Sequence, residues 1–530
     1  MKKIFYTIAG ALLLGLGSCD SLDLAPIDYA ATGNFWQNES EVTTFMYGLH
    51  GQLRSDYQSL LNLGELRGGA MVDGTSSINT SLNSSSIIVS NLTTSSTGIS
   101  NWNGYYGRLL QVNHFIEQLT NECAFLSDAS RKTFLAQAHG LRAYYYFMLY
   151  RTFGAVPLEK DVKVMSGSID VVSLYMARSS AEDVLQFIKD EIKASEEGFA
   201  GNSAFDCYTW SALTTQFLKA QVYLWSAKVS TNDYEKPHQA TGTADLNVAK
   251  EALDKIISSG KFGLQEHFAD IFDYKKKKNN EIILAMPCDF NEYTNWGVNF
   301  VYTPSIVVGS YYAPDGNKMV DVLELGTAGI VRYEWKESLV KSMDLTDSRR
   351  AATFLEYYQD EALTKFGCSM LKLLGHMESG IRQWDSDVIM YRYADVLLMR
   401  AEVENGLTGK CASYINQIRE RAYGDNFSDE VKYVDGSFAE NELALLHERD
   451  KEFVSEGCRW FDVVRLQDAN KQPLVFSAEA AYPKVYGEAA YPVLDKATEQ
   501  HKLVWPVNVS TLTADPELKQ TWGYNEAEGK

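Results

Sequence analysis

The densest cluster of chemically capable side chains lies near the C-terminal end of the chain, where glutamates and arginines alternate. Glu448, Glu452 and Glu456 are one helical turn apart, so a helix would carry all three on one face. A pair such as Glu452 and Asp462 could act as the acid and base of a glycoside hydrolase. The alternative is that arginines fork onto these carboxylates and join neighbouring helices; the candidates are Arg449, Arg459 and Arg465. We favour the ion pairs because they explain the cluster more simply.

A different chemistry is expected at the start of the chain. Lys2 and Lys3 precede an apolar run over residues 4–16, which is typical of a secretory signal peptide and is too short to span a bilayer. The run ends in Leu16-Gly17-Ser18-Cys19, which resembles the lipobox of bacterial lipoproteins. In that motif the cysteine is diacylated and becomes the new N-terminus. We therefore expect residues 1–18 to be removed and Cys19 to carry a lipid anchor.

The remaining cysteines and the histidines do not form a metal-binding pattern. The other six cysteines are widely spaced without a C-x-x-C motif, so we expect mostly buried, apolar side chains. The eight histidines are scattered singly, and no H-E-x-x-H motif is present. We expect no cofactor and no transition metal, while a structural cation remains open.

These residues have to be positioned by helices. Apolar residues at 3–4 spacing predict helices over residues 39–54, 131–151, 179–197, 208–229 and 245–259, and again over 388–404, 410–422, 440–456 and 460–466. Residues 281–285 read as a strand, and residues 74–100, rich in Ser, Thr, Asn and Gly, as a long loop or weak strands. The helix–turn–helix pairs have lengths near those of tetratricopeptide-like repeats.

The chain is therefore divided into a signal peptide (1–18), a tether (19–40), a helical-repeat region (41–270) and a C-terminal region (271–530). The last contains an irregular lobe at about 281–385 and helices at about 386–470. The expected fold class is mainly α: a tetratricopeptide-like scaffold of helical pairs carrying a loop-rich lobe with a few short strands.

Charge and composition narrow the possible partners. The 49 basic and 69 acidic residues give a formal charge of −20, which disfavours nucleic acid and anionic lipid as ligands. The 31 Tyr and 10 Trp suit binding surfaces, although helix packing also uses them. A run of four lysines at 275–278 indicates a solvated loop or, less simply, a docking contact.

Several motifs spread along the chain, in order, resemble those of the SusD/RagB family of surface nutrient-binding lipoproteins. They are Leu141-Arg142-Ala143-Tyr144-Tyr145-Tyr146-Phe147 with the following Arg151, Phe153, Gly154 and Pro157; residues 391–402, RYADVLLMRAE in their core; residues 415–422; residues 448–465; and the closing Trp505-Pro506-Val507 and Gln520-Thr521-Trp522-Gly523-Tyr524. Asn508 and Thr521 depart from the family pattern at the closing motif, which puts a turn in doubt rather than the family. The motif residues have scaffold roles, and we expect Tyr144, Tyr145 and Tyr146 to pack in the core.

The resemblance implies a function and a location. It implies a protein anchored by lipid in the outer membrane and facing the cell exterior. There it would capture an oligosaccharide and pass it to a SusC-like TonB-dependent outer-membrane barrel, without catalysis. Two alternatives stay open: a peptide-capturing RagB-like protein and, less simply, a surface glycoside hydrolase.

The resemblance also implies a shallow ligand surface built on loops. A sugar offers an apolar face for an aromatic ring and hydroxyls for amides, carboxylates or arginine. Two stretches carry such groups: Asn101, Trp102 and Asn103 with Arg67 and Asp73, and Tyr293 and Trp296 with Tyr311 and Tyr312 further on. Both tryptophans could instead be packing anchors.

Overall fold

The computed structural model describes residues 35–74, 84–99, 102–163 and 170–524. The predicted signal peptide, the lipidation site Cys19 and the candidate ligand residue Asn101 lie outside the described residues. The expectations for them stay predictions.

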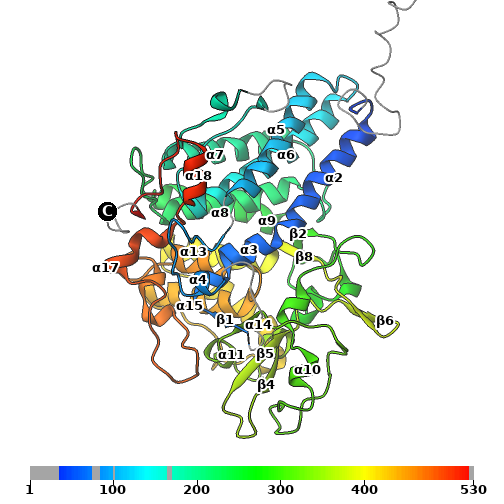
Figure 1. Cartoon of the computed structure of the whole chain (residues 1–530), viewed down its shortest axis with the longest axis vertical. Helices are drawn as coiled ribbons and strands as arrows, with labels where there is room; N and C mark the ends of the chain where they lie inside the picture. Colours follow the sequence, from blue (N-terminus) through cyan, green and yellow to red (C-terminus); the bar gives the residue numbers. More distant parts are fainter. Residues whose placement is uncertain (1–34, 75–83, 100–101, 164–169, 525–530) are drawn as a thin grey trace, which may run out of the picture.

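The upper part of the molecule in Figure 1 is a layer of long helices from the first half of the chain. These helices are α2 (Glu39–Ser55), α3 (Tyr57–Gly64), α5 (Asn103–Asn121), α6 (Asp128–Phe153), α7 (Ala181–Gly198), α8 (Ala212–Lys228) and α9 (Thr243–Ser258). Neighbours in sequence pack as pairs, α6 on α7 and α8 on α9. The repeating helical pairs that the periodicity predicts are therefore present.

Helix α6 is the centre of this layer. Ser127 caps its start by accepting a hydrogen bond from the amide of Ser130, and it ends at Gly154, whose φ of 72° breaks the helical path. From Gly140 to Phe153 every residue is buried, so the helix is surrounded by others on all sides. Tyr144, Tyr145 and Tyr146 are core residues, as the sequence predicts.

The C-terminal helices pack beneath this layer. They are α13 (Tyr393–Thr408), α14 (Ala412–Tyr423), α15 (Phe438–Glu452) and α16 (Arg459–Arg465), and α13 contacts α9, α14 and α15. The prediction of a helix from residue 388 is wrong at its start, because residues 388–392 form strand β8 (Val388–Arg392). Val388 and Ile389 are buried apolar residues that pair with β2 (Ile282–Met286), and this pairing outweighs the helical pattern.

The lower lobe in Figure 1 is built mainly from short elements between residues 281 and 392. The described strands form antiparallel pairs, one of which joins a strand from early in the chain to the lobe. The pairs are β1 (Met71–Asp73) with β3 (Tyr333–Trp335), β2 with β8, β4 (Phe354–Tyr358) with β5 (Phe366–Met370), and β6 (His376–Glu378) with β7 (Ile381–Gln383). The short helices of the chain are α4 (Ser84–Ile88), α10 (Pro304–Val307), α11 (Glu337–Lys341), α12 (Ser348–Thr353), α17 (Lys496–Glu499) and α18 (Val509–Ala514). Tyr302, Val307 and Tyr357 belong to a small apolar core of the lobe's own, separate from the main one.

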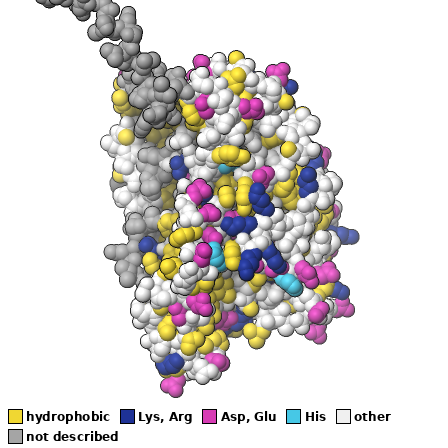
Figure 2. Space-filling model, turned by 90° about the vertical axis from the view of Figure 1, so that its right-hand side faces the viewer, with side chains coloured by type: hydrophobic (Ala, Val, Ile, Leu, Met, Phe, Trp, Pro, Cys, Tyr) yellow, Lys and Arg dark blue, Asp and Glu magenta, His cyan; other side chains and the backbone are white. Residues whose placement is uncertain are grey.

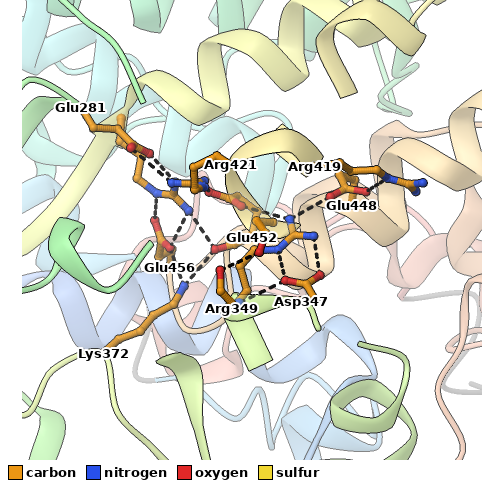
Figure 3. Close-up of polar contacts among 12 residues, drawn as sticks. Glu281, Asp347, Arg349, Lys372, Arg419, Arg421, Glu448, Glu452 and Glu456 are labelled. Atoms are coloured by element: carbon orange, nitrogen blue, oxygen red, sulfur yellow. Dashed lines mark hydrogen bonds and ion pairs between the residues drawn. The ribbon is translucent and has the colours of Figure 1, made fainter. Parts of the chain in front are cut away.

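A buried network of ion pairs joins the lobe to the C-terminal helices (Figure 3). Glu452, fully buried, accepts from Arg349, Arg392 and Arg421. Glu448 pairs with Arg349 and Arg419, and Glu456 with Arg392 and Lys372. Since α12, β8, α14 and α15 all contribute, the network fixes the positions of these elements relative to one another.

The predicted ion-pair role is confirmed, and Arg449 and Arg465 pair with Asp462, but the three glutamates take other partners. Arg449, Arg459 and Arg465 do not reach the three glutamates. Arg449 pairs with Asp395 and Asp462, Arg459 with Asp450, and Arg465 with Glu402 and Asp462. Arg449 directly follows Glu448 on α15, so its side chain projects about 100° around the helix from the glutamate face, towards Asp395 of α13 and Asp462 of α16. Arg459 and Arg465 lie on α16.

Candidate functional site

A groove of about 440 Å³ opens beside the β1–β3 pair and is the candidate ligand site. We call it the β1–β3 groove. It is lined by residues 72–74 of β1 and its end, residues 334–337 of β3 and the start of α11, residues 359 and 364–366 of the β4–β5 turn, and residues 484–485. Four separate parts of the chain therefore meet at one polar hollow, in the loop-rich lobe where the sequence predicts a ligand surface.

The floor of the groove is rigid. Met71 pairs with Trp335 and Asp73 with Tyr333 across the antiparallel strands, and Trp335 is 1% exposed. Gly74 lies so close to Val331 that a Cβ added there would come within 2.2 Å of its carbonyl oxygen. Only glycine allows the two strands to meet this closely at the mouth of the groove.

One wall is a loop held on helix α11. The Nζ of Lys336 donates to the carbonyl of Tyr482 at 2.8 Å, and the amide of Tyr486 donates to Glu337 Oε2 at 3.2 Å. The amide of Glu337 in turn donates to the carbonyl of Lys484 at 3.3 Å. These bonds fix a loop without regular structure against a helix, so Lys484 and Val485 have defined positions in the groove.

The groove combines charged, amide and hydroxyl groups with aromatic side chains. Gln359 and Thr364 offer donors and acceptors, and Lys365 and Lys484 offer exposed ammonium groups. Phe366 lines the groove, and Tyr486, next to the lining residue Val485, is 59% exposed. Flat rings beside hydrogen-bonding groups are the chemistry that a sugar needs for recognition.

The carboxylates and one lysine of the groove are tied into local contacts. Glu334 accepts from the hydroxyl of Tyr357 at 2.7 Å, and Glu337 pairs with Lys341. Burial, with the positive charge of Arg459 nearby, lowers the pKa of Lys336 to about 8. The groove therefore holds one partly desolvated ammonium group beside two exposed ones.

One of the predicted ligand residues, Asp73, lines this groove. Tyr311 and Tyr312 are not among its lining residues. Tyr312 forms a backbone bridge to Tyr358, which directly precedes the lining residue Gln359, and the ring of Tyr311 lies 6.0 Å from that of the buried Tyr357. The groove therefore does not bring the two predicted stretches together.

Other predicted ligand residues serve packing in this structure. Trp102 is 4% exposed and lies edge-on to Tyr106 and Phe153, and Arg67 is fully buried between the rings of Trp460 and Trp505. Neither side chain offers a face to a ligand in this arrangement. For Trp102 this is the packing role that the sequence left open. The rings beside Arg67, Trp460 and Trp505, come from a distant part of the chain.

The stretch that contains Tyr293 and Trp296 lies apart from the groove. Tyr293 packs under Arg54 of α2, with the guanidinium carbon 4.5 Å from the ring centre, and Trp296 packs against the main core. Asn103 is the first residue of α5. Neither Tyr293 nor Trp296 lines the β1–β3 groove.

Sequence reasoning missed Lys336, Gln359, Lys365, Lys484 and Tyr486. One signal could have pointed to the last two. Ala481-Tyr482-Pro483 recurs as Ala490-Tyr491-Pro492, so tyrosines and prolines crowd a stretch that no helix covers. Tyr491 is 79% exposed, and such exposed aromatic residues on loops indicate binding.

The other sequence candidates do not form a site. Glu452 and Asp462, the possible acid and base, are buried at 0% and 2% exposure, so neither can reach a substrate in this structure. Three lysines of the run pair with acids: Lys276 with Asp270, Lys277 with Asp387 and Lys278 with Asp206. The run is therefore no free basic patch.

The face of the molecule in Figure 2 carries charges of both signs. Figure 2 shows Lys and Arg side chains beside Asp and Glu side chains, with apolar ones between them, so this face carries no field of one sign.

In the part of the chain that the structure describes, no three His, Cys, Asp or Glu side chains are grouped to hold a metal ion. Within the same residues, no helix has the length and apolar character needed to cross a bilayer.

The fold and the groove together define a class of protein: a helical scaffold that presents a preformed polar groove to solvent. Comparison with known proteins agrees. Residues 37–209 match the family described as "Starch-binding associating with outer membrane", and residues 360–524 match the "SusD family".

Solved structures extend the match to the whole fold. A SusD superfamily protein from Bacteroides fragilis NCTC 9343 is 35% identical, with a TM-score of 0.83 over 92% of this chain and 100% of that one. NanU of B. fragilis is 31% identical, with a TM-score of 0.78 over 94% of this chain and all of its own. The SusD-like protein P38 of Formosa agariphila is 27% identical over 99% of each chain.

The chain therefore belongs to the SusD/RagB family, as the motifs predict. Its mainly helical fold is that of the SusD superfamily. Membership indicates a glycan-binding protein associated with the outer membrane, and the proteins of this family are binding proteins.

Proposed function

We propose that this protein is a cell-surface lipoprotein that captures an oligosaccharide in the β1–β3 groove. It then passes the oligosaccharide to a SusC-like TonB-dependent barrel in the outer membrane. The observation that carries the proposal is the groove itself, which Gln359, Thr364, three lysines and Phe366 line, with the exposed Tyr486 next in sequence to the lining residue Val485. Binding of this kind needs no cofactor and no metal.

The anchor and the barrel complete the proposed mechanism. A lipid on Cys19 would hold the protein at the membrane, and residues between Cys19 and α2 would let it move over the mouth of the barrel. Tethering raises the effective concentration of the protein beside its partner, so the contact between the two can be weak and reversible.

We prefer a glycan to a peptide as the ligand because of the side chains at the edge of the β1–β3 groove. Exposed aromatic rings next to amide and hydroxyl groups match the alternating apolar faces and hydroxyls of a sugar chain. An extended peptide would instead be expected to add to the edge of a sheet through its backbone.

Isothermal titration calorimetry of the full-length protein in detergent against a panel of oligosaccharides and peptides tests the binding function. We expect micromolar to millimolar binding of an oligosaccharide that Tyr486→Ala weakens. Incubation of the bound glycan with the protein should release no new reducing ends. Binding of peptides alone, or cleavage of the glycan, would contradict the proposal.

The partner is tested in the membrane. Affinity purification of the tagged protein from detergent-solubilised outer membranes should recover a large TonB-dependent barrel, whereas a tagged unrelated lipoprotein should not recover it. Repeated purification without any such barrel would contradict the proposed transfer step while leaving glycan capture intact.

A further inference from the structure

Three lysines of the β1–β3 groove have no described carboxylate within ion-pair distance, although hydrogen bonds from Thr364 and Lys365, together with the charge of Lys365, lower the pKa of the nearby Asp360. Among the residues that the structure describes, Lys336, Lys365 and Lys484 form no ion pair with Asp or Glu. Acidic residues outnumber basic ones in this chain, whose formal charge is −20, so most lysines and arginines could find an acidic partner. Three lysines without such a partner in one groove are therefore unusual. Unpaired ammonium groups gathered in one groove are therefore a feature that needs an explanation.

The carboxylates that share the groove already have partners. Glu337 is held by Lys341 and by the amide of Tyr486, and Glu334, 5% exposed, accepts from Tyr357. Asp73 also has a polar contact within the protein. These acids are engaged in the walls of the groove, whereas the ammonium groups of Lys365 and Lys484 are exposed.

Lys336 adds a desolvated charge to the two exposed ones. It lies at the junction of β3 and α11, and its Nζ has one hydrogen bond, to the carbonyl of Tyr482. A partly buried ammonium group with no counter-ion is stabilised when an anion arrives, and it forms shorter, stronger hydrogen bonds to a carboxylate or sulfate than to a neutral hydroxyl.

We propose that the β1–β3 groove selects negatively charged glycans, whose carboxylate or sulfate groups bind Lys336, Lys365 and Lys484. This inference rests on the proposed function, because it names the class of glycan that the same groove would take. The sugar hydroxyls would bind Gln359 and Thr364, and a ring face would lie on Tyr486.

The test compares acidic glycans with neutral forms of the same backbone. Calorimetry would use the full-length protein in detergent with oligogalacturonides and their methyl esters, and with carrageenan oligosaccharides and their desulfated forms. We expect one acidic form to bind at least about tenfold more tightly than its neutral counterpart. Its affinity should fall as the salt concentration rises from 50 to 500 mM, since salt screens exposed charges. The two pairs distinguish carboxylate from sulfate.

Variants locate the effect in the groove. The double variant Lys365→Gln/Lys484→Gln should lose about tenfold in affinity for the acidic form and little for the neutral form. Lys261→Gln, a control on another exposed lysine outside the groove, should change neither. Circular dichroism would verify that each variant is folded.

The outcomes separate this inference from the proposed function. Equal affinity for acidic and neutral forms, unchanged in the double variant, would overturn charge selection and leave glycan binding standing. Absence of binding to every glycan in both pairs and in the wider panel would contradict the proposed function as well. Tighter binding of polyglutamate than of any glycan would point to acidic peptides and overturn both.

Discussion

At the scale of single residues, exposure separates the side chains available to a ligand from those that support the fold. Trp102 is flanked by asparagines in sequence, yet it is 4% exposed, whereas Tyr486 in an irregular loop is 59% exposed. The flanking residues alone cannot reveal this difference, because Phe153 and Tyr106 cover Trp102 only once α5 and α6 have packed.

We expect Tyr486→Ala to weaken glycan binding by about tenfold, since stacking of a ring on a sugar face is removed while the backbone bond to Glu337 remains. Calorimetry with the ligand identified in the panel measures this. Tyr47→Ala is a matched control, because Tyr47 is also 59% exposed but lies on α2, away from the groove. Equal losses in the two variants would argue against a role for the groove.

Glu65 predicts a specific pH dependence of stability. Its buried carboxylate accepts the amides of Ser455 and Gly457, and burial raises its pKa from 4.5 to about 7. Below pH about 4.5 the group is protonated in both the folded and the unfolded states. As the pH rises towards 7, the unfolded chain ionises first, so this group lowers the stability of the native state by up to about 3 kcal/mol.

Glu65→Gln should remove that dependence. The free energy of unfolding of the wild-type protein minus that of the variant should fall between pH 4.5 and 7 and then level off. Urea denaturation at a series of pH values measures this difference. A difference that is constant with pH would mean that the carboxylate keeps an ordinary pKa in the folded state.

At the scale of elements, the buried ion network holds the lobe on the helices. Arg392 is the last residue of β8 and binds Glu281, Glu452 and Glu456 at once. These carboxylates hold the pKa of the guanidinium well above its usual range, and the arginines hold the pKa of Glu452 below its own. The network is satisfied only while all its members are present.

Arg392→Ala should therefore destabilise the protein by about 3 to 5 kcal/mol, because it leaves several buried carboxylates without their shared partner. Chemical denaturation followed by circular dichroism measures the change. Lys193→Ala, which removes an exposed pair with Glu197 on α7, should change the stability by less than about 1 kcal/mol. Similar values for both variants would show that the network adds no more than a surface pair.

Much of the helical organisation of the chain can be predicted from its sequence. The 3–4 spacing of apolar residues locates α6, α7, α8 and α9 to within a few residues, since each helix buries a continuous face. The register of β8 and the partners of Glu452 cannot be predicted in this way. The register of β8 depends on its pairing with the distant strand β2. The partners of Glu452 come from three different elements, 31, 60 and 103 residues away along the chain.

The candidate site can be predicted only in part from the sequence, because it too depends on segments that lie far apart in the chain. Asp73, chosen from its residue type near a polar loop, lines the groove, whereas Tyr311 and Tyr312, chosen in the same way, do not. Lys336, Gln359 and Lys484 belong to three different segments with no motif in common. They become a site only where β1 pairs with β3 and the loop after residue 481 packs on α11.

At the scale of the whole molecule, the proposed function places the protein at a membrane through a lipid on Cys19. Among the described residues, no helix is long and apolar enough to cross a bilayer. Two or three acyl chains give stable anchoring, whereas a single chain gives marginal binding.

Cys19→Ser should therefore release the protein from the membrane without unfolding it. After phase separation in Triton X-114, the wild-type protein should partition into the detergent phase and Cys19→Ser into the aqueous phase. Cys458→Ser is the matched control, since Cys458 lies in the body of the protein and should leave partitioning unchanged. The released protein should bind the same glycan with unchanged affinity, because the β1–β3 groove is complete within residues 72–485. Growth on that glycan should nevertheless fail, as capture would no longer take place beside the transporter; normal growth of the Cys19→Ser strain would contradict the proposed role of the tether.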